Sequence, residues 1–136
     1  NGNIYDAYTG WNVAWNYRYR ITDTECSISS VTTTLNVEFR WPRWVNYDSG
    51  TFALKKKWDA YMQSLQRHEN GHKDIGVKAA GEIERSIADL DPAETCDKLA
   101  ETANKIGRQI ISEYAARERE YDARTNFGET QGAKFP

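Results

Sequence analysis

Hydrophobic and polar residues alternate with a period of two along much of the first 41 residues. Five apolar residues share one side of the first alternating stretch: Trp11, Val13, Trp15, Tyr17 and Tyr19. A second alternating stretch, residues 31–41, follows after the polar residues 22–25. Alternation is typical of strands with one buried face, and a short polar connection between two such strands predicts an antiparallel hairpin. Pro42 is expected to end the second strand because it cannot donate to a strand ladder.

The period changes to three or four residues in the second half of the chain. Apolar residues recur at this spacing over residues 54–87 and again over residues 99–121. This predicts two amphipathic helices, the second of which reaches about Asp122. The residues after Thr125 are expected to form a loop. Together the elements predict an α+β fold, in which a strand hairpin packs on a long antiparallel helical hairpin as a single domain over residues 1–136.

The ends of the predicted helices contain residues that commonly cap helices. Thr51 or Ser49 can accept the first free N–H groups of the first helix. Asp91-Pro92 is expected to stop that helix and to begin the second, with Asp91 as its N-cap and Glu94 completing a capping box.

Residues 68–72 read His-Glu-Asn-Gly-His, and His68 and His72 are the only histidines of the chain. On a helix, residues four apart lie on the same face, so both imidazoles could bind one ion. Glu69 lies about 100° further round the helix, where it would stay off the metal and take a proton from water. This H-E-x-x-H pattern predicts a zinc site with Glu69 as the general base. The alternative is a pair of ordinary helix histidines with hydrogen bonds in the core, beside a solvated Glu69.

The two histidines leave the predicted zinc site one protein ligand short. A catalytic zinc usually has three protein ligands and one water. Glu82 and Glu84 lie on the same helix at least about 15 Å further along its axis, which excludes them. Pairing the two helices around the turn between them places residues 111–115 opposite the histidines. Four carboxylates of the second helix and its exit loop are therefore candidates: Glu113, Glu118, Asp122 and Glu129. Asp122 and Glu129 are favoured, because a loop after Asp122 can fold back over the site.

The composition is that of a packed and polar protein. Aromatic residues make up 12% of the chain, which argues against disorder. The formal net charge of −2 gives no sign of a general nucleic-acid-binding surface. Lys55, Lys56 and Lys57 form a basic run that is expected to be a solvated helix face. No stretch approaches the roughly 18 apolar residues that a membrane span requires.

The chain has two cysteines, Cys26 and Cys96, which could be free core thiols, zinc ligands or one disulfide. Both have polar neighbours in the sequence, whereas buried thiols usually have apolar ones. A disulfide is therefore favoured, and with it an extracytoplasmic location, because disulfides persist in oxidising compartments. Such a bridge would connect the strand layer to the start of the second helix.

Several short motifs occur in a distinctive order along the chain. They are Tyr8-Thr9-x-Trp11-x-Val13-x-Trp15, Cys26, Trp41-Pro42-Arg43-Trp44, Trp58, Leu65-x-x-His68-Glu69-x-Gly71-His72, Cys96 and Tyr121-Asp122-x-x-Thr125-x-x-Gly128-x-x-Gln131-Gly132-Ala133. In this combination they resemble the DUF922 family of bacterial proteins, which is described as predicted secreted zinc-dependent proteases. The resemblance covers nearly the whole chain.

The resemblance implies a secreted or periplasmic, disulfide-linked, zincin-like metallopeptidase domain. It also implies a histidine before the glycine of the last motif, where this chain has Phe127. Asp122, in the same motif, therefore becomes the leading candidate for the third zinc ligand. The expected activity is that of a zinc-dependent hydrolase, in which metal-activated water attacks an amide carbonyl of a peptide or protein substrate. The alternative is a non-catalytic domain that binds a metal or a peptide on the same scaffold.

Overall fold

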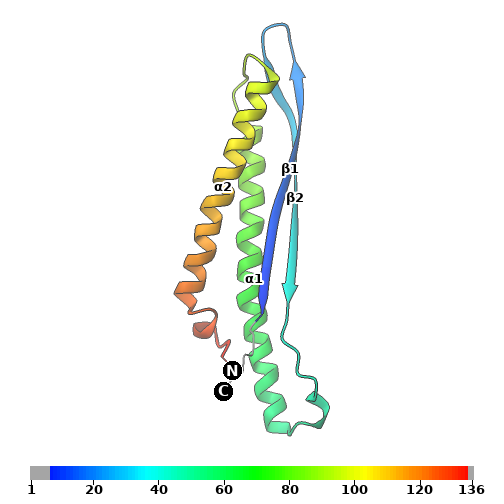
Figure 1. Cartoon of the computed structure of the whole chain (residues 1–136), viewed down its shortest axis with the longest axis vertical. Coiled ribbons are helices and arrows are strands. Elements are labelled where there is room, and N and C mark those ends of the chain that lie inside the picture. Colours follow the sequence, from blue (N-terminus) through cyan, green and yellow to red (C-terminus); the bar gives the residue numbers. More distant parts are fainter. Residues whose placement is uncertain (1–6, 135–136) are drawn as a thin grey trace. The chain divides into compact units, whose positions relative to one another are not determined.

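The structure, a computed structural model, describes residues 7–134 and contains a two-stranded antiparallel sheet and two long helices (Figure 1). Strand β1 is Tyr8–Ile21 and strand β2 is Cys26–Arg40. Helix α1 is Phe52–Ala88 and helix α2 is Cys96–Thr125. The predicted α+β class, with a strand hairpin followed by two helices, is confirmed.

The described residues form two compact units, and each unit contains parts of all four long elements. Unit 1 comprises residues 7–10, Val37–Asp74 and 118–134. Unit 2 comprises Trp11–Asn36 and Ile75–Arg117. The H-E-x-x-H residues therefore lie in unit 1 and both cysteines in unit 2. The single domain over residues 1–136 stays a prediction.

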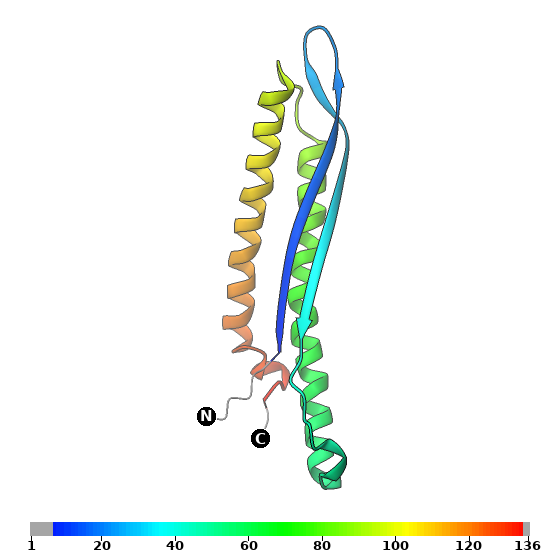
Figure 2. The same cartoon turned by 45° about the vertical axis from the view of Figure 1, so that its right-hand side comes forward.

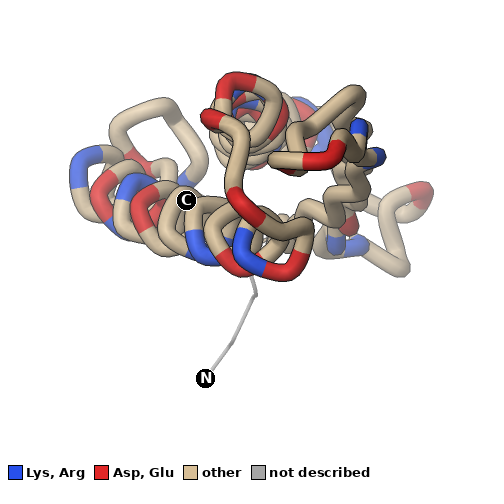
Figure 3. The backbone as a smooth tube through the Cα atoms, turned by 90° about the horizontal axis from the view of Figure 1, so that it is seen from above, with Lys and Arg blue, Asp and Glu red and all other residues tan. Residues whose placement is uncertain are grey.

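The core of unit 2 contains residues of all four long elements, whose ribbons Figure 2 draws. The buried members of this core are Val13, Ala79, Ala80, Ile83, Ile87, Ala103, Ile110 and Tyr114. Trp11, Trp15 and Tyr17 of β1 pack against them, as do Val31 and Leu35 of β2. In β1 the residues between these positions are exposed, and in β2 Thr32 and Thr34 are exposed while Thr33 is half-buried, so the predicted two-residue alternation is confirmed there. Tyr19 is an exception, because it was predicted on the buried side and is 38% exposed. Acidic and basic residues are interspersed along the backbone (Figure 3).

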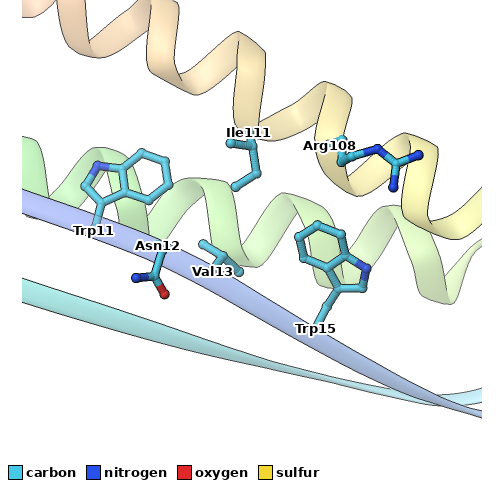
Figure 4. Close-up of a pocket in the computed structure, with 6 residues that line it drawn as sticks. All are labelled: Trp11, Asn12, Val13, Trp15, Arg108 and Ile111. Carbon is cyan, nitrogen blue, oxygen red and sulfur yellow. The ribbon is translucent and has the colours of Figure 1, made fainter.

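Two tryptophans of β1 reach towards α2 within unit 2 (Figure 4). Nε1 of Trp15 donates to Oδ1 of Asn104 at 3.0 Å, which fixes the orientation of the indole. A pocket of about 320 Å³ lies beside these rings, lined by Trp11, Asn12, Val13, Trp15, Arg108 and Ile111.

The predicted cap of α1 is confirmed, but the predicted start of α2 is wrong. Oγ1 of Thr51 accepts the N–H of Leu54 at 3.2 Å. Helix α2 begins at Cys96 rather than after Asp91. The reason is that Ala93 exchanges two backbone hydrogen bonds with Cys26, at 2.8 and 2.9 Å, which holds this part of the connection extended.

A disulfide joins Cys26, at the start of β2, to Cys96, at the start of α2, with their Cα atoms 5.2 Å apart. The predicted disulfide between the strand layer and the second helix is thus confirmed. Its presence is compatible with a secreted or periplasmic protein. Within residues 7–134, neither long helix has the run of apolar residues needed to cross a bilayer.

Candidate metal centre

Two imidazoles and one carboxylate converge in unit 1. His68 and His72 lie one turn apart on α1 and are buried, with 3% and 7% of their surface exposed. Nε2 of His68 lies 3.0 Å from Oδ1 of Asp122, and Nε2 of His72 lies 2.7 Å from the same oxygen. The ligand atoms of these three residues all lie within 4.8 Å of one another, so the group could hold a metal ion.

Asp122 was the sequence-based choice of third ligand, and the structure brings it to both histidines. The predicted helix pairing, however, is wrong, because Glu118 and Asp122 lie opposite the histidines instead of residues 111–115. Helix α2 also begins later than predicted, at Cys96. Glu113 and Glu129, two other candidates, are exposed and lie outside the metal-binding group found in the described chain.

The other nitrogen of each imidazole also has a partner. Nδ1 of His68 lies 2.7 Å from Oε1 of Gln131, in the short helix η2 (Glu129–Gln131). Nδ1 of His72 contacts Oε2 of Glu118. Histidines that bind metals usually donate their second ring N–H to a carbonyl or a carboxylate, which orients the ring and fixes the tautomer. Both histidines of this chain have that arrangement.

A chain of hydrogen bonds sets the tautomer of His68. The hydroxyl of Tyr121 donates to the backbone oxygen of His68 at 2.8 Å, so its oxygen is left to accept Nε2–H of Gln131 at 3.1 Å. This bond turns Oε1 of Gln131 towards Nδ1 of His68. Thr125 donates its own hydroxyl proton to the backbone oxygen of Tyr121 at 2.8 Å, so towards Nδ1 it can only accept. Nδ1 of His68 therefore carries the hydrogen, and Nε2 points a lone pair at Asp122.

The lone pairs of the three converging atoms are suited to binding a cation. Because the Glu118 carboxylate only accepts hydrogen bonds, Nδ1 of His72 also carries its hydrogen. Nε2 of His68, Nε2 of His72 and Oδ1 of Asp122 then face one another as three acceptors. Three acceptors at 2.7–3.0 Å repel one another unless they share a positive charge, either a proton or a metal ion.

The charges around His72 favour its protonated form. Burial disfavours the charged form of His72, but the hydrogen bond and charge of Glu118, together with Asp122, outweigh that effect. The pKa of His72 is therefore raised above its ordinary value of 6.5. A proton on His72 balances part of the carboxylate charge, and a metal ion would have to displace it.

Tyr121 packs against both imidazoles, whose own ring centroids lie 4.9 Å apart. Its ring stacks on His68 with centroids 4.7 Å apart and meets His72 edge-on at 4.8 Å. This approach requires Gly71, because a Cβ at that position would overlap the phenol ring. The glycine within the H-E-x-x-H motif thus leaves room for the side chain of Tyr121.

The turn after α2 brings Gln131 back to the histidines. Asn126, Phe127 and Gly128 have positive φ angles of 49°, 56° and 94°, which reverse the chain. Gly128 also lies directly against His68, since a Cβ there would be 3.0 Å from Cγ of the imidazole. The ring of Phe127 is 66% exposed, so this side chain lies largely in solvent at the position where the family resemblance implies a histidine.

Glu69 is buried in unit 1 with 4% of its surface exposed. Its Oε1 atom accepts a hydrogen bond from the hydroxyl of Thr9, near the start of β1, at 2.6 Å. This hydrogen bond holds the carboxylate in one orientation. The residue before it, His68, is one of the candidate metal ligands. Its role as a general base stays a prediction.

Sequence reasoning missed several residues that surround the imidazoles. The sequence pattern assigns no role to Gln131, Thr125 or Thr9, and it places Tyr121 only at the end of the periodic apolar residues of the second helix. A signal for all four was present, because each belongs to one of the motifs that carry the family resemblance. Glu118 was a candidate ligand, whereas the structure pairs it with the far nitrogen of His72.

Comparison with curated proteins gives no match, and neither does comparison with solved structures. A family model described as "bacterial protein of unknown function (DUF922)" matches residues 1–129. Those residues include His68, His72 and Asp122, whereas Gln131 lies beyond them. The chain therefore belongs to the DUF922 family.

Proposed function

We propose that this protein is a zinc-dependent hydrolase of peptide or amide bonds, with the metal held by His68, His72 and Asp122. The observation that carries the proposal is the convergence of two imidazole lone pairs and one carboxylate oxygen on one point. Two histidines and one carboxylate form a ligand set used by catalytic zinc, which keeps its fourth position open. Zinc in this site would act as a Lewis acid and lower the pKa of a water molecule to near neutrality.

Glu69 is the residue that we assign to proton transfer. Thr9 holds Oε1 of this carboxylate at 2.6 Å, so Oε2 is the atom that would take a proton from the attacking water. The same atom would then return the proton to the nitrogen of the leaving amine. Thr9 would act by orienting the carboxylate. Because the protein contains a disulfide, we place this activity in the periplasm or outside the cell.

Metal content is the direct test of the binding half of the proposal. Protein purified without chelator is expected to contain about one zinc per chain, and Asp122→Ala is expected to lose it. The exposed Glu113→Gln is a matched control on the same helix and should retain the metal. Less than about 0.1 zinc per chain, with no uptake on titration, would exclude a zinc enzyme.

The catalytic half is tested by Glu69→Gln, which keeps the size of the side chain and removes its basicity. Hydrolysis of a mixed peptide substrate is expected to fall at least about 100-fold while zinc remains bound. Glu129→Gln, at an exposed position, should hydrolyse like the unaltered protein. If the unaltered protein binds zinc yet hydrolyses nothing, the chain is a non-catalytic metal-binding domain.

A further inference from the structure

The segment between β2 and the first turn of α1, residues 41–57, exposes large apolar side chains. Val45 is 79% exposed and Phe52 is 77% exposed, the highest values among the large hydrophobic residues of the described chain. Trp41 and Leu54 are partly exposed in the same segment, at 40% and 39%. Several large apolar side chains exposed within one short segment are typical of a surface that meets a partner.

Aromatic contacts hold this segment in place, so the exposure does not come from a loose loop. The ring of Trp44 meets Tyr47 edge-on at 5.2 Å and meets Trp58 of α1 at 5.9 Å. The backbone of the segment is tied by the short helix η1 (Tyr47–Ser49). Val45 and Phe52 therefore project from a fixed frame.

The same segment is basic. Within residues 41–57, Arg43, Lys55, Lys56 and Lys57 outnumber the single acidic residue Asp48, which leaves a net charge of +3 in a chain whose total is −2. Just outside the segment, the Asp59 carboxylate accepts the hydroxyl of Tyr47. The cations are interleaved with the aromatic rings. Nζ of Lys56 lies 5.5 Å from the centre of the Phe52 ring, and Nζ of Lys55 lies 5.2 Å from that of Tyr47.

We propose that residues 41–57 dock on the surface of an anionic lipid bilayer. Basic side chains are attracted to the negative surface potential of such a membrane. Exposed aromatic and aliphatic side chains enter the boundary between head groups and acyl chains. A soluble polyanion would engage the lysines but leave Val45 and Phe52 in water, so a bilayer satisfies both features of the segment. None of these residues belongs to the metal centre.

Co-sedimentation of the full chain with lipid vesicles tests this proposal, with chelator present so that the metal plays no part. Binding is expected to vesicles that contain phosphatidylglycerol and not to vesicles of phosphatidylcholine alone. Lys55→Gln/Lys56→Gln/Lys57→Gln is expected to weaken binding about 100-fold. Phe52→Ser is expected to weaken it about tenfold, because an apolar contact with the acyl region is lost.

Matched controls lie outside the segment. Arg18→Gln/Arg20→Gln/Lys105→Gln removes the same charge from exposed positions, and Ile21→Ser removes an apolar side chain that is 72% exposed. Both controls should bind within about twofold of the unaltered protein. Equal binding to neutral and anionic vesicles, or full binding by the triple lysine variant, would overturn the proposal. Equally strong binding to dextran sulfate that is unaffected by Phe52→Ser would identify a polyanion site in place of a membrane site.

Discussion

The side-chain oxygen of Gln131 lies 2.7 Å from Nδ1 of His68, on the far side of the imidazole from Asp122. Gln131→Leu removes this acceptor, so the ring loses the partner that holds the hydrogen on Nδ1. We expect the affinity for zinc to fall about 10- to 100-fold, measured by competition with a chromophoric chelator. Gln131→Glu keeps an acceptor at the same place and should restore most of the affinity.

The control for this change is Glu129→Gln in the same short helix, where the side chain is exposed. Its affinity for zinc should equal that of the unaltered protein. If Gln131→Leu also binds zinc normally, packing by Tyr121 is sufficient to orient His68 and the hydrogen bond is dispensable.

The raised pKa of His72 predicts how zinc binding depends on pH. Zinc needs the neutral imidazole, so affinity should fall as the pH falls through the pKa of His72, which lies above 6.5. Below that pKa the apparent affinity should drop about tenfold per pH unit for the single proton displaced. Glu118→Gln removes the main group that raises this pKa, so the decline should begin at a lower pH. Isothermal titration at a series of pH values measures both.

The stability of the metal-free protein gives an independent measurement of the interaction between His72 and Glu118. Because the folded pKa is raised, protonated His72 stabilises the fold below pH 6.5, and this contribution is lost as the pH rises through the folded pKa. Thermal unfolding in the presence of chelator should show the loss, and Glu118→Gln should reduce it, since Asp122 alone would then raise the pKa of His72. A melting temperature that does not change as the pH rises from 6.5 through the raised pKa of His72 would contradict the assignment of the proton to His72.

The parts of the site that depend on local geometry could be predicted from the sequence. Positions four apart on a helix share a face whatever the rest of the fold does, so His68 and His72 could be placed together from spacing alone. The alternation around Val13 likewise predicts a strand face without knowledge of its partner. Asp122 was favoured because a loop after it could fold back over the site and because it shares a motif with Phe127, where the family resemblance implies a histidine.

The parts that depend on distant contacts could not be predicted. Asp91 and Glu94 carry a good local signal for a helix start, yet Ala93 pairs with the backbone of Cys26 and α2 begins only at Cys96. Which carboxylates of α2 face the histidines depends on helix packing that the sequence pattern does not reveal. The contact of Gln131 with His68 depends on a run of positive φ angles at Asn126 and Phe127, residue types that do not require them.

Removal of the disulfide is expected to destabilise the fold. The bridge joins residues 70 apart, and in the chain-entropy model closing a loop of this length is worth about 4 kcal/mol of unfolding free energy. Cys26→Ala/Cys96→Ala should lower the free energy of unfolding by about this amount, measured by urea denaturation. The paired backbone of Cys26 and Ala93 remains in this variant, so the secondary structure should persist. A loss below about 1 kcal/mol would show that the unfolded chain is already restricted near these residues.

Phe127 combines a strained backbone with an exposed ring. Its φ angle of 56° lies in the left-handed region, which L-residues other than Asn and Asp rarely adopt, and 66% of its surface is exposed. Phe127→Asn should therefore raise the free energy of unfolding by about 1 kcal/mol, because strain is relieved and little burial is lost. The neighbouring Gly128→Ala should act in the opposite direction, since its φ of 94° is also positive and the added Cβ would press on His68 at 3.0 Å. Chemical denaturation measures the change in the free energy of unfolding for both variants. A lower free energy of unfolding for Phe127→Asn would mean that contacts of the ring outweigh the strain of its backbone.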